Sequence, residues 1–415
     1  MKNYAANSLP SPNKVTPMQA PIEATVAAFE AGLGDQLEGI FLFGSIAAGL
    51  DRPGESDINM LVVVADDTSP HLLRDTFHPV WEAYQDELKQ APLIATSTAF
   101  QRHMKLNPAL ARHITRSNKQ LFGPSDLLDF HPKNANPHEL IGYIVAEALQ
   151  VSMALTPQLL DEETAVLKTR QLKTLYRHVF HSNPPEKDTA VQIYAQIQQF
   201  LNNIVPKLPA AQKWSAAKSK VTTSPILPGL QSIYQELGTT ILVFGFLEPQ
   251  QITNIAWNRL GKHLPKGTTG LQITTVEQFC LTCVYERPAD LLLRKFQHTW
   301  GIDFLPTLKP TSYHFNRQSA RLPSDILIQA LPNTFLTKED ASDETLHKII
   351  HDYQNKMLNI RLENELLTRF GKSTKFTPPQ PVPDRETPPR DRIDALFNQF
   401  KWWSEFYANA MQNGE

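Results

Sequence analysis

The first half of the chain contains two apolar runs separated by a turn of small residues and a polar loop. The first run, residues 39–43, ends at Gly44-Ser45, and small residues continue to Gly49. A polar loop at 51–55 follows, and the second apolar run begins directly after Asp57. Short apolar runs bounded by turn residues are typical of buried strands. The pattern predicts a strand, a tight turn with a short helix, a loop and a second strand.

Candidate ligand-binding residues lie where these two strands meet. Gly44 allows the backbone to approach a ligand closely, and the amide groups that open a following helix point toward a bound anion. Alternation along the second strand places Asp57 and Asn59 on one face, away from Ile58. We expect this face to border the same space as Ser45.

Apolar residues at three- and four-residue spacing predict further helices. The clearest spans 69–90, where Ser69-Pro70 provides an N-cap and a first helical position. A third strand is expected over 92–97. The other predicted helices in this half span residues 22–37, 108–121, 138–155, 161–181 and 188–205.

The predicted helix 161–181 carries a stripe of basic residues. Its members are Lys168, Arg170, Lys173, Arg177, His178 and His181. We interpret this stripe as a solvated helix face, and a phosphate- or RNA-binding surface is the alternative. Aromatic residues among these positions are few, with only Tyr176 and Phe180, which favours the first interpretation.

The second half resembles the first at low similarity. A linker is predicted at 207–228, which is rich in Ala, Lys, Ser, Thr and Pro. The matching segments are 60–64 with 240–245, the helix around Trp81 with 252–263, 93–98 with 271–276, 107–112 with 287–292, and the helix from 161 with 340–367. Their offset stays at about 180 residues, which a tandem duplication predicts. In this hypothesis the second copy has lost the glycine-serine turn and its acids, and buries surface against the first as a scaffold.

The C-terminal segment combines a proline-rich linker, 376–390, with an aromatic helix. Its apolar stripe consists of Ile393, Leu396, Phe397, Phe400, Trp403 and Tyr407, widened by Trp402 and Phe406. Such a face must be buried. We expect it to pack back on its own protein, in one form as an arm swapped in a homodimer over residues 393–407. Docking in the groove of a protein partner is the alternative.

The only two cysteines, Cys280 and Cys283, form a C-x-x-C pair. Neither a thioredoxin-like context nor two further zinc ligands at suitable spacing accompanies them, so we expect buried apolar cysteines on a helix. On the next predicted helix, Arg287, Arg294, Lys295 and His298 form a basic patch. We expect a solvated or salt-bridged face there.

Composition narrows the classes of function. The chain has 415 residues with 41% hydrophobic and 20% charged residues, which is ordinary for a globular protein of two or three domains. The net charge of -2 gives no general attraction to nucleic acid. We find no signal-peptide pattern and no apolar run long enough for a membrane, so a cytoplasmic protein is expected.

The predicted organisation has five parts. They are a flexible tail (1–21), an α+β domain (22–130), a helical domain (131–210), a second α+β and helical half (225–375), and the linker with its aromatic helix (376–415).

Five residues of the first half match a known pattern. Gly44, Ser45, Gly49, Ser56 and Asp57 resemble the nucleotidyltransferase superfamily that includes DNA polymerase beta, especially its small bacterial members and the aminoglycoside nucleotidyltransferases. In that pattern a strand, Gly-Ser and a helix precede Asp-x-Asp on the next strand, and a later strand carries a third carboxylate. The resemblance covers residues 22–130. It implies an α+β fold with a mixed sheet flanked by helices plus a helical bundle, here with a second, degenerate copy.

The chain departs from the family at the metal-binding positions. Asn59 stands in place of the second carboxylate, Ala48 replaces a commonly basic residue, and the third strand, 93–98, contains no acid. Nucleotidyl transfer uses two divalent ions, and Mg²⁺ prefers negatively charged oxygen ligands. We therefore expect Asp57 to hold one ion weakly. A nucleotide that carries its own Mg²⁺ could still bind at Gly44-Ser45.

Three functions are compatible with these residues. The favoured one is a degenerate member that binds a nucleotide, or nothing, and is regulatory, with weak or no transfer activity. The second is an active enzyme that moves a nucleoside monophosphate from a nucleoside triphosphate to a hydroxyl. In it Ser45 and the amides after Gly44 would hold the triphosphate, Asp57 would be the main metal ligand, and Asn59 a weak one. The third is a scaffold protein that acts through its C-terminal helix.

Overall fold

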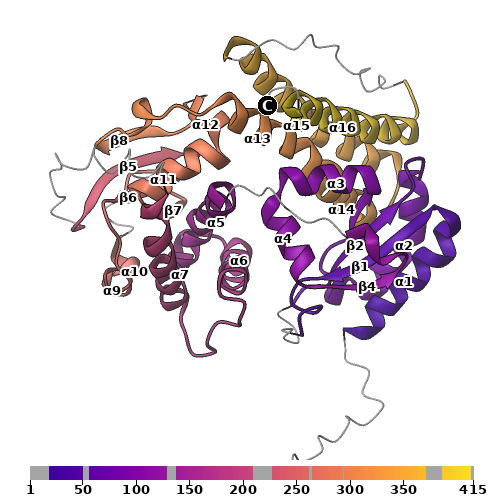
Figure 1. Cartoon of the computed structure of the whole chain (residues 1–415), viewed down its shortest axis with the longest axis horizontal. Helices are drawn as coiled ribbons and strands as arrows, with labels where there is room; N and C mark the ends of the chain where they lie inside the picture. Colours follow the sequence, from indigo (N-terminus) through magenta and orange to yellow (C-terminus); the bar gives the residue numbers. More distant parts are fainter. Residues whose placement is uncertain are drawn as a thin grey trace, which may run out of the picture.

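The computed structural model describes residues 18–49, 56–128, 137–208, 227–260, 264–292, 294–370 and 386–412. Over these residues the chain forms two mixed four-stranded sheets surrounded by helices, an α+β architecture (Figure 1). Most of the predicted tail, linker and proline-rich segment lies outside the described residues. No helix in the described part has the length and hydropathy needed to cross a bilayer.

The first sheet has the strand order β3-β2-β1-β4. β1 (Leu37–Phe43) lies at its centre, antiparallel to β2 (Asn59–Val64) and to β4 (Asn118–Phe122), and β2 is parallel to β3 (Leu93–Thr96). β1 and β2 are buried along almost their whole length, as their apolar runs predict. Because they are antiparallel and Phe43 lies opposite Asn59, the end of β1 and the start of β2 share one edge of the sheet.

The predicted helix over 108–121 is wrong at its C-terminal end. α4 (Pro108–Arg116) ends early, and residues 118–122 form β4, which pairs with β1. β4 is an edge strand with exposed or half-buried side chains, so it lacks the apolar alternation that identifies a strand in a sequence.

The second sheet has the equivalent order, β7-β6-β5-β8. It consists of β5 (Leu230–Glu236), β6 (Thr239–Phe244), β7 (Gly270–Thr275) and β8 (Gln297–Gly301). The relative directions match those of the first sheet: β5 is antiparallel to β6 and β8, and β6 is parallel to β7. β5 and β6 meet in a hairpin at Leu237-Gly238, where the first sheet has the much longer segment from Gly44 to Ile58.

The two sheets also share local irregularities. β1 shifts register between Leu37 and Gly39, and β5 between Leu230 and Ser232. At the C-terminal end of the edge strand in each sheet, a glycine at φ +83° or +84° lies against the backbone of this shifted segment, and a Cβ on either would meet a carbonyl oxygen at 2.2 or 2.1 Å. Neither position can therefore accept a side chain without backbone movement. These glycines are Gly123 and Gly301.

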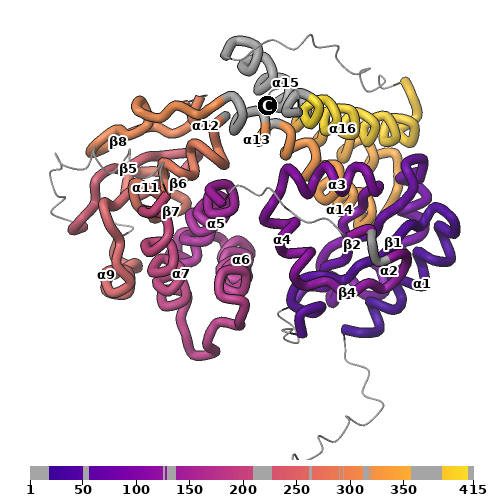
Figure 2. The backbone as a smooth tube through the Cα atoms, viewed as in Figure 1, coloured from indigo at the N-terminus to yellow at the C-terminus, as the bar shows by residue number. Residues whose placement is uncertain are grey.

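The helices that follow each sheet in the sequence pack against the other sheet (Figures 1 and 2). α5 (Pro137–Val151), α6 (Glu162–Phe180) and α7 (Ala190–Ile204) share a hydrophobic cluster with β5, β6 and β7. The Tyr194 hydroxyl of α7 donates to the carbonyl of Ile273 in β7 at 3.0 Å. Conversely, the helices from α13 (Ser312–Asp325) onward share a cluster with β1 and β2.

The remaining elements complete the two clusters. Around the first sheet lie α1 (Gln19–Leu33), α2 (Pro70–Leu88), α3 (Ser97–Leu106), α14 (Leu331–Thr337), α15 (Asp343–Phe370) and α16 (Pro389–Gln412). Around the second lie α9 (Pro249–Asn254), α10 (Trp257–Leu260), α11 (Val276–Leu281) and α12 (Pro288–Leu292). Short 3₁₀ helices occur at 34–36, 125–128, 152–155, 157–159, 205–207 and 305–307, and π-helical turns at 282–286 and 326–330.

The aromatic stripe of the C-terminal helix packs on its own chain. In α16, Ile393, Leu396, Phe400 and Trp403 are fully buried and Tyr407 is 1% exposed. They share the cluster of the first sheet, so the chain itself covers these side chains and leaves none of the five for a partner's groove.

Neither Cys280 nor Cys283 is part of a disulfide, and both are buried in a third cluster, as expected; burial raises the pKa of the Cys283 thiol. The four basic residues predicted to share the next helix do not share one, because α12 ends at Leu292 and His298 lies in β8. The expected salt-bridged surface is present for Arg287, which pairs with Glu236 and Asp290, and for Lys295, which pairs with Asp290.

The crossed packing generates a prediction. Fragments 1–208 and 227–415 each contain one sheet and the helices that cover the other, so each alone exposes two apolar surfaces. We expect the fragments to be insoluble or unfolded when produced separately, and to copurify as a folded pair when coexpressed with a tag on one. Circular dichroism and size-exclusion chromatography check this. Phe400→Asp in the second fragment should abolish copurification. Two fragments that fold separately and do not associate would contradict the crossed packing.

Candidate functional site

The predicted tight turn follows β1, but the short helix expected after it does not form over residues 45–49, which are hydrogen-bonded turns. Gly44 has φ +83°, and its amide donates to the carbonyl of Ser117 at 3.1 Å. A Cβ at Gly44 would lie 3.2 Å from Nδ2 of Asn59 and 3.3 Å from Nε2 of His113. Glycine is therefore favoured both by the backbone conformation and by the close approach of two side chains.

Asp57 lies beside two cations, and no other described carboxylate joins it in a metal-binding group. Its Oδ1 is 3.2 Å from Nζ of Lys89 and 3.8 Å from a guanidinium nitrogen of Arg170. Lys89 is the C-cap residue of α2, in the left-handed conformation. Arg170 comes from α6, a helix whose apolar face belongs to the second sheet's cluster. A helix that packs with the second sheet thus helps to neutralise a carboxylate at the edge of the first.

Asn59 already has a hydrogen-bond donor on its side-chain oxygen. Nε2 of Gln90 donates to Oδ1 of Asn59 at 2.8 Å, while Nδ2 of Asn59 lies 3.4 Å from the carbonyl oxygen of Asp57. The oxygen that was expected to serve as a weak metal ligand is therefore engaged within the protein.

These residues do not fit a two-metal centre. The described residues contain no group of three or more His, Cys, Asp or Glu side chains arranged to hold an ion. Divalent ions in nucleotidyl transfer need several negative oxygens, whereas Asp57 has two cations within 4.0 Å. Two acids of the preceding loop, Asp51 and Glu55, lie outside the described residues.

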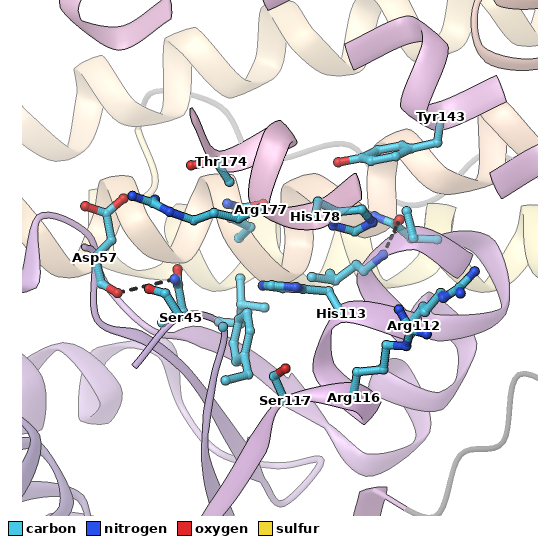
Figure 3. A pocket seen from close by; sticks show the side chains of 18 of the residues that line it. Ser45, Asp57, Arg112, His113, Arg116, Ser117, Tyr143, Thr174, Arg177 and His178 are labelled. Carbon is cyan, nitrogen blue, oxygen red and sulfur yellow. Dashed lines mark hydrogen bonds between the residues drawn. The ribbon is translucent and has the colours of Figure 1, made fainter. Parts of the chain in front are cut away.

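A cavity of about 680 Å³ opens at this edge of the sheet (Figure 3). The four residues that the sequence singles out, Gly44, Ser45, Asp57 and Asn59, all line it. Its walls come from β1, β2, α4, α5, α6, α7 and α13, so it lies between the two halves of the chain. Apolar side chains form much of the lining, among them Phe43, Met60, Leu93, Leu110, Leu140, Ile144, Val179 and Phe200.

The polar wall of the cavity is strongly basic. Two helices, α4 and α6, end there with basic residues in their last turns, and a helix C-terminus favours positive charge. The rings of His113 and His178 contact each other on this wall, with centroids 5.6 Å apart (Figure 3). We call the whole set the arginine-histidine cluster: Arg112, His113, Arg116, Arg177, His178 and His181.

Crowding of cations shifts the ionisation of the cluster. Burial, followed by the charges of His113, His181, Arg112 and Arg116, lowers the pKa of His178 to about 4. Burial and His181 lower the pKa of His113. Burial and Arg116 likewise lower the pKa of Arg112. The unliganded cavity therefore disfavours positive charge at these positions, as a site prepared for an anion does.

A second polar group closes the α13 side of the cavity. Arg321 donates to Glu286 at 2.9 Å and to Asp325 at 3.2 Å, and its guanidinium lies over the Tyr143 ring at 5.3 Å. Burial raises the pKa of Glu286. Asp325 also lies 3.5 Å from Nε2 of His103. These pairs join α5, α13 and the turn after α11, and so stabilise the junction of the two halves.

Several site residues were missed or misread from the sequence. Predicting the α6 stripe to be a solvated face is wrong for Arg170, Arg177 and His178, because Arg170 reaches Asp57 and the other two line the cavity. Lys89 and the α4 residues were not recognised at all. The sequence did contain one signal, because two predicted helices both carry basic residues. These are Arg112 and Arg116 on one helix and Arg177 and His181 on the other.

Comparison with known proteins gives little information about this site. No family model and no curated protein sequence matches the chain. One solved structure with a partly similar arrangement is spectinomycin adenyltransferase from Enterococcus faecialis, determined with ATP and spectinomycin. It is 14% identical, the match covers 47% of this chain and 85% of that one, and the TM-score is 0.29. At such a TM-score the likeness does not bear on the function of this chain.

The lowered pKa of His178 predicts a pH dependence of stability. His178 takes up a proton near pH 6.5 in the unfolded chain but only near pH 4 in the folded chain. The free energy of unfolding should therefore decrease as the pH is lowered from 6.5 to 4. One such group contributes a slope of up to ~1.4 kcal/mol per pH unit. We expect His178→Gln to reduce the slope in urea denaturation at several pH values, whereas the exposed control His351→Gln should keep it. Equal slopes in the two variants would contradict the assignment.

Proposed function

We propose that the protein binds a nucleotide in this cavity and is a degenerate member of the nucleotidyltransferase superfamily, regulatory in role and with weak or no transfer activity. The observation that carries the proposal is the pairing of Asp57 with Lys89 and Arg170 beside the Gly44 turn. A triphosphate needs backbone amides, positive charge and a close approach, and this edge of the sheet combines all three.

The size and lining of the cavity support a nucleotide. A volume of about 680 Å³ lies within the range of small-molecule sites, roughly 300–1,000 Å³. Ser45 and the amides after Gly44 would hold phosphate oxygens. The apolar wall that includes Leu110, Val179 and Phe200 would accommodate the base and sugar.

The same residues account for weak or absent transfer. Lys89 and Arg170 place two fixed positive charges where the superfamily pattern has carboxylates and metal ions, so they would neutralise a triphosphate without a divalent cation. Fixed cations can bind phosphate, but among the described residues no acid or metal group beside Asp57 is placed to activate an attacking hydroxyl. We therefore propose binding that needs no Mg²⁺.

The parallel between the two sheets supports a tandem duplication. Strand order, strand directions, the register shifts in β1 and β5, and the positive-φ glycines Gly123 and Gly301 all correspond. Bulges at equivalent places in two sheets are structural features rather than chance defects. In the second copy the Leu237-Gly238 hairpin replaces the ligand-binding segment, so we propose that this half is a scaffold that completes the cavity from the other side.

Calorimetric titration tests the nucleotide proposal. We expect ATP or another nucleoside triphosphate to bind in EDTA, with affinity that added Mg²⁺ does not increase. Lys89→Met should weaken binding about tenfold or more, because a charge-assisted contact to phosphate contributes ~1.5–3 kcal/mol. Lys207→Met, at an exposed position, is the control. Absence of binding to any nucleoside triphosphate, or binding that requires Mg²⁺, would refute the corresponding part of the proposal. A labelled-phosphate assay measures the residual transfer.

A substitution at Asn59 tests the reason for the missing metal site. Asn59→Asp keeps the acceptor for Gln90 and adds a second carboxylate next to Asp57. We expect it to raise the affinity for Mn²⁺, measured by electron paramagnetic resonance or calorimetry, because two carboxylates then share the site. Asn203→Asp on the exposed face of α7 adds the same charge elsewhere. No gain over this control would show that Lys89 and Arg170 keep the ion out even with two acids present.

A further inference from the structure

The arginine-histidine cluster lies at the α4 and α6 side of the cavity, beyond the groups that the nucleotide proposal uses. It adjoins the Gly44 turn through His113, whose Nε2 would be 3.3 Å from a Cβ at Gly44. From there it continues to Arg116 and His181, whose side chains contact each other. Positive groups therefore extend along the cavity past the place assigned to the triphosphate.

Within the described part of the chain, no carboxylate is paired with Arg112 or Arg116 at this end of the cavity. Among the described residues that line it, the only acids are Asp57 and Asp325. Asp57 is held by Lys89 and Arg170, and Asp325 lies within 3.5 Å of Arg321 and His103. The cluster therefore has an excess of positive charge in the absence of a ligand.

The arrangement of the two arginines suits one class of anion. Arg112 and Arg116 are four residues apart, so they project from the same side of α4, and both are exposed at the cavity. Guanidinium groups form paired hydrogen bonds with phosphate, and a dianionic phosphate monoester gains more from several cations than a carboxylate does. Figure 3 shows Arg112 and Arg116 on the opposite side of His113 from Asp57.

We propose that the arginine-histidine cluster is a second anion subsite, which takes the phosphate monoester group of a second small-molecule ligand beside the nucleotide. The inference rests on the proposed function only in placing a nucleotide in the neighbouring part of the cavity. The cluster also determines which ligands the cavity disfavours. A polycationic ligand would face Arg112, Arg116 and Arg177 with no free carboxylate, and such like-charge contact is unfavourable.

Histidine-detected NMR on the full chain tests the subsite, with inorganic phosphate as the probe. A phosphate bound among these cations stabilises protonated imidazole, so we expect phosphate to raise the pKa of His181 and His178, with and without saturating ATP. In Arg112→Ala/Arg116→Ala the phosphate affinity derived from this shift should fall about tenfold or more. Arg259→Ala, an exposed arginine on α10, should behave as wild type. Spermine should produce no shift.

The outcomes separate this inference from the proposed function. Equal phosphate response in the double variant and wild type, or binding of spermine in place of phosphate, would overturn the subsite. Lys89→Met should lower the affinity for ATP and keep the histidine response to phosphate. A chain that binds no nucleotide but still loses its phosphate response in Arg112→Ala/Arg116→Ala would refute the nucleotide proposal and leave the subsite standing.

Discussion

Crossed packing of helices on sheets is the constraint on which the site depends. α6 buries Leu172, Leu175 and Tyr176 in the cluster of the second sheet. Its other face, with Arg170, Arg177 and His178, is thereby held against the open end of the first sheet. The second half thus helps to position α6 through α5 and α7, which pack on both, and α6 brings Arg170 to Asp57.

The same arrangement gives the second sheet a structural role at the site, although the described strands of that sheet do not line the cavity. The second sheet has a two-residue hairpin, Leu237-Gly238, where the first has its glycine-serine turn and Asp57. The second sheet supplies apolar surface to the cluster that contains α5, α6 and α7. Ion pairs such as Arg321 with Glu286 stabilise the junction between the two halves. In return, α13 to α16 cover the first sheet, and Trp403 and Phe400 are fully buried there.

Most of the ionisable side chains that line the cavity are basic. One carboxylate, Asp57, is placed between Lys89 and Arg170, and the wall beyond it carries arginines and histidines at two helix C-termini. The dipoles of these helices offset part of the repulsion among the cations. Burial and mutual repulsion keep the pKa of His178 at about 4, so the imidazole is neutral near pH 7. The described side chains around Asp57 thus present cations where a metal centre would need further carboxylates.

Local pattern in the sequence was sufficient for most elements and for the glycine-serine turn. Apolar runs specify β1, β2 and β3, since buried central strands need continuous apolar residues, and helical spacing specifies α2, α6 and α16. The edge strands β4 and β8 escaped detection because they are polar and exposed, so no periodicity marks them.

Only the tertiary structure decided which side chains share the cavity. Asp57, Lys89 and Arg170 are separated by 32 and 81 positions along the chain, and their meeting depends on which sheet covers which helices. A basic stripe on an amphipathic helix looks the same in a sequence whether water or a cavity faces it. The sequence by itself determined that one acid stands where a metal centre would need several. The crossed packing determined that cations stand beside it, because long-range contacts leave no local pattern.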